Sequence, residues 1–392
     1  MLSLCLGLFL ADAAVSFADD SLILAFNLHI LTGVRVIVYL LALFMAIVIY
    51  GLIGLAPMIP KRLFLPVTLF NPVAYLLILP FFIYCYGRLQ QVEWVASFCQ
   101  VIFCLGILYW FQGRIKFRWP LLTESELEPR RFSWRNLLAF LLVNALVLLP
   151  AAVVYLGVCA ALAVNHFSEG FMALHPGGLT VQVRKYVRND GKTIHLCPMA
   201  HVGEPDFYRK LSRSFATNSI ILLEGVTDNK NLLTNRLSYR RMATSLGLAE
   251  QETAFEPSRG ELVAADVDVE QFTTQTIDFL NLAMLLHVRG VNLNTVRELA
   301  EYSPPPHLQE QLLDDLLTKR NRHLLGELHA RLSESDDIVV PWGVAHMPEI
   351  AKDIQKSGFR LEQTQEYVVI RFRPAGHKSN TAAKERGSGT PK

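Results

Sequence analysis

The sequence predicts a chain of two unlike parts: an α-helical transmembrane region of four spans, followed by an α/β (α+β) domain in which helices flank a central sheet. Residues 35–165 contain four charge-free apolar runs, each long enough to cross a membrane, with charged residues between them. Residues 166–375 carry charges throughout and alternate strand patterns with helix patterns. The 392 residues are 52% hydrophobic, which is high for a soluble protein.

Four apolar runs are predicted to span the membrane. A hydrocarbon core about 30 Å thick takes roughly 20 apolar residues of helix, and each run reaches that length. Several runs contain proline, which membrane helices tolerate. The runs are residues 36–60, 63–87, 94–113 and 136–165.

The N-terminal segment, residues 1–34, allows two interpretations. It has an apolar stretch followed by Ser-Phe-Ala, which is similar to a cleavage site, but it lacks the basic residues that begin a secretory signal. It is either a cleaved signal or an apolar segment at the membrane interface.

The basic residues between the spans predict the orientation. Short loops rich in Lys and Arg stay in the cytoplasm. Lys61 and Arg62 follow the first run and only Arg88 follows the second, whereas six basic residues lie between the third and fourth runs: Arg114, Lys116, Arg118, Arg130, Arg131 and Arg135. The N-terminus and everything after residue 165 should therefore lie outside the cytoplasm, which in a bacterial inner membrane means a periplasmic or extracellular domain.

Residues 166–375 are predicted to form one soluble domain. Of the six cysteines only Cys197 belongs to it, so it contains no internal disulfide. Residues 376–392 are polar and rich in Gly, Ser and Lys, which is typical of a disordered tail. The net charge of +2 and the lack of a large basic patch give no indication of a nucleic-acid partner.

Strand and helix signals alternate through this domain. Strands are predicted at residues 179–187, 192–197, 219–225, 260–267, 335–343 and 367–372, and helices at 205–215, 231–248, 270–289, 307–332 and 348–358. Strands separated by helices favour a sheet with helical layers.

One local pattern occurs twice in the domain. Ala200-His201 and Ala345-His346 each follow a strand that contains proline, and each precedes a glutamate at the start of a helix. Ligands of open α/β sheets bind beyond the carboxyl ends of the strands, which is where both histidines are expected.

A third strand ends at Glu224. Together with His201 and His346 it would supply three protein ligands for a catalytic divalent metal such as Mn, Co, Zn or Fe. With eleven histidines in the chain, the repeat could also arise by chance. Asp266 and Asp268 follow a fourth strand, and either could instead cap the long helix.

These segments resemble the TraB/PrgY/GumN/Tiki family, whose hallmark is a pair of Gly-x-x-His motifs. The second motif is intact as Gly343-Val-Ala-His346, whereas the first is Pro198-Met-Ala-His201, in which proline replaces glycine. The resemblance covers roughly residues 180–372 and excludes the spans. It also implies roles for Arg320 and Asn321, which stand where the family has an Arg-Asn pair.

The resemblance implies an erythromycin-esterase-like or ChaN-like fold and a membrane-anchored metal-dependent hydrolase, acting on peptides outside the cytoplasm. His201, Glu224 and His346 would hold the metal, Arg320 would stabilise an oxyanion, and Asn321 would orient a ligand or bind substrate. Two alternatives stay open. One is a metal-free hydrolase with His201 as the base. The other is a non-enzymatic membrane protein that sequesters a signal peptide or regulates a membrane partner.

Overall fold

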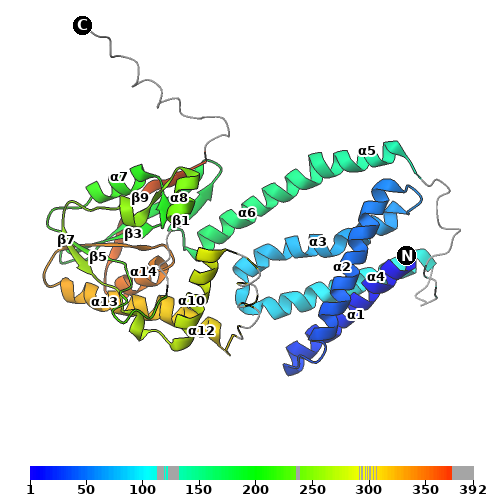
Figure 1. Cartoon of the computed structure of the whole chain (residues 1–392), viewed down its shortest axis with the longest axis horizontal. Coiled ribbons are helices and arrows are strands. Elements are labelled where there is room, and N and C mark those ends of the chain that lie inside the picture. Colours follow the sequence, from blue (N-terminus) through cyan, green and yellow to red (C-terminus); the bar gives the residue numbers. More distant parts are fainter. Residues whose placement is uncertain are drawn as a thin grey trace, which may run out of the picture. The chain divides into compact units, whose positions relative to one another are not determined.

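The computed structural model describes residues 1–112, 119, 121, 132–234, 239–290 and 307–372, with isolated residues between 291 and 306. The predicted tail, residues 376–392, and most of the basic loop before residue 132 lie outside the described residues. The chain forms two compact units, Met1–Ala163 and Val164–Lys392. Figure 1 shows long helices in the first unit and a sheet with helices around it in the second.

The N-terminal unit consists of long apolar helices. They are α1 (Leu2–Phe26), α2 (Thr32–Leu55), α3 (Lys61–Tyr84) and α4 (Leu89–Gln112), followed by α5 (Trp134–Val143), which continues through a π-helical turn (Asn144–Leu148) into α6 (Leu149–Phe167). Within the described residues, five helical segments are long and apolar enough to cross a membrane: α1, α2, α3, α4 with the short helix before it, and α5–α6 as one.

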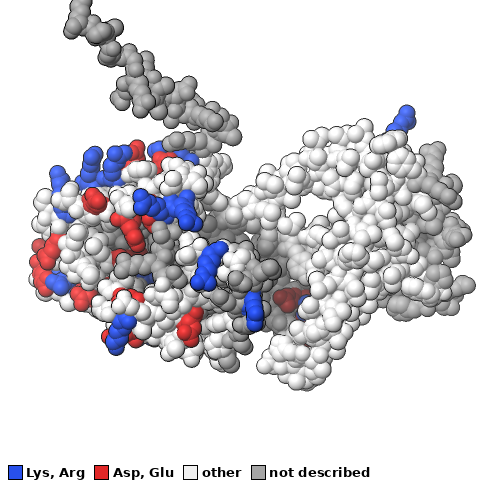
Figure 2. Space-filling view, in the orientation of Figure 1, with Lys and Arg blue, Asp and Glu red and all other residues white. Residues whose placement is uncertain are grey.

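The surface of these helices is apolar where a soluble protein would be polar. Phe44 is 63% exposed and Val154 is 67% exposed. Figure 2 shows charged side chains gathered on the C-terminal unit, while the visible face of the N-terminal unit is almost free of them. Such a surface is stable in a hydrocarbon environment, so the N-terminal unit associates with a membrane.

Helix α1 is one more candidate span than the sequence analysis counted. Residues 1–34 were expected to be a signal or an interfacial segment, and the helix also contains three aspartates, Asp12, Asp19 and Asp20. In the structure these three side chains are buried between helices and do not face outward. The apolar residues of α1, among them Leu6 and Phe9, belong to one core with residues of α2, α3 and α4.

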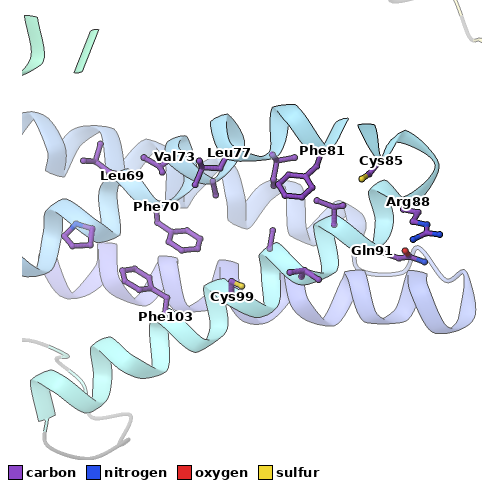
Figure 3. A pocket seen from close by; sticks show the side chains of 16 residues that line it. Leu69, Phe70, Val73, Leu77, Phe81, Cys85, Arg88, Gln91, Cys99 and Phe103 are labelled. Atoms are coloured by element: carbon purple, nitrogen blue, oxygen red, sulfur yellow. The ribbon is translucent and has the colours of Figure 1, made fainter. Parts of the chain in front are cut away.

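Between α3 and α4, apolar side chains line an open pocket of about 820 Å³, with Arg88 and Gln91 at one end (Figure 3). Phe70 and Phe103 are stacked inside it at a ring distance of 5.1 Å. Because its walls are almost wholly apolar, the pocket fits hydrocarbon chains.

The C-terminal unit is built on a mixed sheet, in agreement with the predicted α/β class. The strands run in the order β1 (Met172–His175), β2 (Gly178–Val187), β3 (Thr193–Met199), β8 (Asp337–Gly343), β5 (Ile220–Leu223) and β7 (Glu261–Ala264), and β9 (Arg360–Arg371) pairs with β2. β3, β8, β5 and β7 are mutually parallel, whereas β1, β2 and β9 are antiparallel additions. A small second sheet joins β4 (Val202–Gly203) to β6 (Ala249–Glu250).

Helices cover both faces of this sheet because side chains alternate along its strands. Ile338, Val340 and Trp342 of β8 point to one face, where they pack with α13 (Lys319–Arg331) and α14 (Met347–Lys356). Val339 points to the other face, where it packs with α7 (Pro205–Arg213). The parallel centre is therefore enclosed on both faces, as parallel sheets require.

The remaining helices differ in part from the predicted ranges. The predicted helix at 231–248 is described only as α8 (Arg240–Leu246), and residues 235–238 lie outside the described part. Helix α9 (Gln251–Ala254) follows it, and a 3-10 turn (Val269–Gln271) precedes α10 (Thr274–Arg289). The predicted helix at 307–332 is α12 (Leu308–Leu313), a π-helical turn (Asp314–Thr318) and α13 in succession.

Candidate functional site

The carboxyl ends of the four parallel strands gather the residues that the sequence analysis selected. His201 follows β3, His346 follows β8, Glu224 follows β5 and Asp266 follows β7. The register pairs Met199 with Gly343, so the two histidines leave neighbouring strands within three residues of paired positions. This edge of an α/β sheet is where ligands bind, because loops and helix starts converge there.

Arg320 from α13 joins these strand ends. Its Nε donates to Asp266 Oδ1 at 3.0 Å and its Nη2 to Asp266 Oδ2 at 2.7 Å, which makes a two-point ion pair. The same Nη2 donates to Glu224 Oε1 at 2.8 Å. Burial acts to lower the pKa of Arg320, but the hydrogen bonds and charges of Asp266 and Glu224 outweigh it and raise that pKa. Arg320 is therefore a permanent cation held between two buried carboxylates.

His346 is fixed on both ring nitrogens. Its Nδ1 lies 2.6 Å from Asn321 Oδ1 and its Nε2 lies 3.3 Å from Arg320 Nη1. Both neighbours are compatible with a neutral ring that donates from Nδ1 and accepts at Nε2. Burial lowers the pKa of His346, the charge of Glu224 opposes that shift and the charge of Arg320 reinforces it. His346 is thus a neutral, immobilised imidazole whose Nε2 lone pair faces a guanidinium.

Asn321 connects this histidine to the next helix. Its side chain is buried, its Oδ1 faces His346, and its Nδ2 donates to Glu349 in the first turn of α14. Glu349, the glutamate that follows His346 at the start of the predicted helix, anchors Asn321. Arg320 and Asn321, which stand where the family has its Arg-Asn pair, thus both contact the imidazole of His346.

Gly343 lets Glu224 approach the backbone of β8. Its amide nitrogen donates to Glu224 Oε2 at 2.5 Å. A Cβ at this position would lie 3.3 Å from that oxygen, a tight contact. In the first copy of the pattern Pro198 lies within β3 and has no N–H to donate, so that copy cannot make the same contact.

His201 is set apart from this network. Its ring is exposed and stacks on Tyr239 at a centroid distance of 5.1 Å. Among the described residues, no hydrogen bond or ion pair links it to Glu224 or His346. Its backbone carbonyl accepts from Gln251 N at 2.9 Å. The structure therefore brings Glu224, His346, Arg320 and Asn321 into one network and leaves His201 outside it, stacked on Tyr239.

The three predicted metal ligands, His201, Glu224 and His346, do not lie together as a metal-binding group in this structure. Among the described residues, no three His, Cys, Asp or Glu side chains lie together in a way that could hold a metal ion. Arg320 contacts Glu224 and His346, so a second cation between them would be repelled. The metal site predicted from the sequence therefore has no support from these contacts.

Asp266 is the residue whose part in the site the sequence analysis did not assign. It was weighed as a helix cap, but it pairs with Arg320 and accepts from Gly225 N at 3.0 Å and Val267 N at 2.8 Å. Asp268, the other candidate cap, accepts from Glu270 N at 3.0 Å at the start of the 3-10 turn. The sequence signal for Asp266 was its place at the end of a fourth strand.

No protein-family model, curated protein or solved structure matches the chain. The resemblance to the TraB/PrgY/GumN/Tiki family and the fold it implies therefore stay predictions, carried by the motif residues alone.

Proposed function

We propose that the C-terminal domain is a membrane-anchored hydrolase of peptides or related amide and ester substrates, with His201 as the general base. One observation carries the proposal: the exposed His201 lies beyond the carboxyl end of β3, and the paired strand β8 leads to His346, which contacts the network of Arg320, Glu224 and Asp266. Among the described residues, no group hydrogen-bonds to the ring nitrogens of His201, as a base requires, whereas both nitrogens of His346 are engaged.

His201 would take a proton from water as the water attacks the substrate carbonyl, and would return it to the leaving group. The negative charge that develops on the carbonyl oxygen requires a donor. Arg320 supplies one if its Nη1, whose contacts to His346 Nε2 at 3.3 Å and Leu316 O at 3.4 Å are long, turns to the substrate. Glu224 and Asp266 would hold the guanidinium in place.

The metal-dependent version predicted from the sequence remains the second mechanism for the same reaction. In that version His201, Glu224 and His346 bind Mn, Co, Zn or Fe, and the metal activates water. The contacts of Arg320 with Glu224 and His346 favour the metal-free version, because the guanidinium already supplies the positive charge that a metal would bring.

We also propose that the domain lies outside the cytoplasm and that α1 is a fifth span. The basic residues before and after each span support the orientation. Adding α1 moves only the N-terminus, to the cytoplasm, and leaves the C-terminal domain on the outer side.

The test is digestion of a peptide and ester library by the full-length protein in nanodiscs, read by mass spectrometry with and without EDTA, Mn and Co. His201→Ala should lower the rate at least about 100-fold, since a general base typically contributes that much. The matched control is His323→Ala, an exposed histidine on α13, which should leave the rate unchanged.

Equal cleavage by wild type and His201→Ala would contradict the assignment of the base. Activity that EDTA removes and Mn or Co restores, with about one metal bound per chain, would establish the metal-dependent version. If nothing is cleaved but a peptide still binds, the domain is a sequestering or regulatory protein and not a hydrolase.

A further inference from the structure

The N-terminal unit contains a cavity with both apolar and polar walls inside its bundle of apolar helices. The cavity has a volume of about 300 Å³ and is lined by side chains from α1, α2, α3 and α4. Three of them carry charge: Asp12, Arg35 and Glu93. Ionisable residues are rare in membrane helices because they are costly there, so each needs a partner or a use.

Arg35 already has partners in this bundle. Its Nη1 donates to Asp20 Oδ1 at 2.5 Å and lies 3.5 Å from Asp19 Oδ2. Both aspartates are fully buried, and Asp19 also accepts from Thr32 at 3.2 Å. The positive charge of Arg35 is therefore neutralised by Asp19 and Asp20, with the charge of Glu93 also acting on it, and Arg35 does not pair with Asp12.

One of the two carboxylate oxygens of Asp12 has no hydrogen-bond partner among the described residues. The residue is 2% exposed, and its Oδ2 accepts from Gln100 Nε2 at 2.8 Å and from Asn71 Nδ2 at 3.3 Å. Its Oδ1 is buried with no hydrogen-bond partner, and none of the described residues forms an ion pair with it. An ionised Oδ1 lacks a donor and a protonated one lacks an acceptor, so in either state the group is unsatisfied.

The residues that line the cavity indicate which kind of ligand would pair with Asp12 Oδ1. Aromatic rings of Tyr39, Phe70, Tyr75 and Phe82 line it together with Asp12. Aromatic faces attract organic cations, and a carboxylate supplies the counter-charge. The volume is about ten times the share of one water molecule, which is too large for a bare metal ion and suits a small organic molecule.

We infer that this cavity binds a small organic amine in its protonated form. The ammonium N–H donates to Asp12 Oδ1 and the hydrocarbon part packs against the aromatic walls. This site is in the membrane unit and is independent of the function proposed for the C-terminal domain. Phe70, Ala74, Ile78 and Ala96 line both this cavity and the apolar pocket of Figure 3, so they form the wall between the two.

The inference is tested by thermal unfolding of the full-length protein in nanodiscs, with n-butylamine as the probe. A ligand that binds only the folded state raises the midpoint in a concentration-dependent way. We expect a saturable rise of several degrees with n-butylammonium and none with n-butanol, its neutral counterpart. Sodium chloride and tetramethylammonium chloride at equal ionic strength should also give none, because neither supplies an N–H donor.

Variants locate the site. Asp12→Asn should abolish the rise while keeping the midpoint without amine, because Asn can still accept from Gln100 and Asn71. Tyr39→Leu should weaken binding about tenfold by removing one aromatic wall. Tyr50→Leu is the matched control on the same helix: Tyr50 lies outside the cavity, where it donates to Asn144 Oδ1 at 2.8 Å, so the affinity should not change.

Three results would overturn the inference: an equal rise with sodium or tetramethylammonium, an equal rise with n-butanol, or no rise with amine up to about 100 mM. If Asp12→Asn does not fold, the comparison of Tyr39→Leu with Tyr50→Leu tests the site instead. Equal affinity of the two variants for n-butylammonium would show that the amine does not bind in this cavity.

Discussion

At the scale of single residues, Arg320 is the group on which the candidate site depends. It neutralises Asp266, whose side chain is fully buried, and Glu224, whose side chain is 12% exposed. A buried ion pair adds little net stability compared with apolar residues, but removing one partner leaves the other charge uncompensated. The network is therefore intolerant of single changes.

Arg320→Ala should destabilise the C-terminal domain by about 3–5 kcal/mol, because two buried carboxylates lose their cation. Arg331→Ala is the control on the same helix: Arg331 pairs with Glu334 at 2.8 Å on the surface, where an ion pair adds little stability. Hydrogen exchange of peptides covering β5 and β8, in full-length protein, measures both. Similar protection in the two variants would contradict the structural role of Arg320.

Gly343→Ala tests the close approach of Glu224. The added Cβ lies 3.3 Å from Glu224 Oε2 and 3.6 Å from His346 Cδ2, so the carboxylate must withdraw from the Gly343 amide. We expect the free energy of unfolding to fall by about 1 kcal/mol. The rate of hydrolysis should fall by more than the loss of folded protein accounts for. Gly326→Ala on α13, where a Cβ meets nothing within 4 Å, is the control.

His346 gives the site a pH dependence. Its pKa is lowered by burial, so it stays neutral in the folded state below its ordinary pKa of 6.5, while the unfolded chain takes up a proton there. The unfolded state then binds more protons, so stability falls as the pH is lowered through about 6.5 and is regained above it. His346→Gln should flatten this dependence between pH 5 and 7, as measured by hydrogen exchange of β8 and α14. An unchanged slope would contradict it.

At the scale of elements, the π-helical turn between α12 and α13 fixes the start of α10. It places Asp315 so that its Oδ2 accepts from Thr273 N and from Thr273 Oγ1, both at 2.8 Å. Thr273 is in turn the N-cap of α10, and its Oγ1 accepts from Thr276 N at 3.4 Å. The buried carboxylate of Asp315 thus links the N-cap of α10 to the π-helical turn before α13.

This connection predicts that Thr273 and Asp315 act together. Thr273→Ala should cost about 1 kcal/mol, the usual value of an N-cap. Asp315→Asn should cost more, because one of the two acceptor oxygens that serve Lys319 and Thr273 becomes an NH2 group and the negative charge beside Lys319 is lost. Since the residues are in contact, the double variant should lose clearly less than the sum of the two single variants, as measured by denaturant unfolding monitored on α10. Additive losses would show that the cap and the turn are independent.

At the scale of the whole molecule, the number of spans decides where each end of the chain lies. A reporter fused after Phe372 should be active only outside the cytoplasm, whether four or five helices cross. A reporter at the N-terminus distinguishes the two: a cytoplasmic signal supports α1 as a fifth span, and an external one supports four. A cytoplasmic signal at Phe372 would contradict the orientation deduced from the basic loops.

The sequence by itself determined the class of each part of this protein. Uncharged runs of about 20 residues can be stable only in a membrane or a core, so helices 36–60 and 63–87 were predictable from composition. Period-two alternation and short apolar runs likewise predicted β2, β3, β5 and β8, because these patterns depend on local geometry. The positions of His201, His346 and Glu224 at strand ends followed from the same local reasoning.

Only the tertiary structure decided which of these residues meet. Asp266 and Arg320 are 54 residues apart and pair because β7 ends beside α13, which no local pattern shows. The same reason separates His201 from the network although its motif suggested a shared site. Asp12 is likewise bound by Asn71 and Gln100 from two other helices, a contact that no local pattern in residues 1–34 indicates. Burial and partners are properties of the fold, and a charge can be interpreted only when both are known.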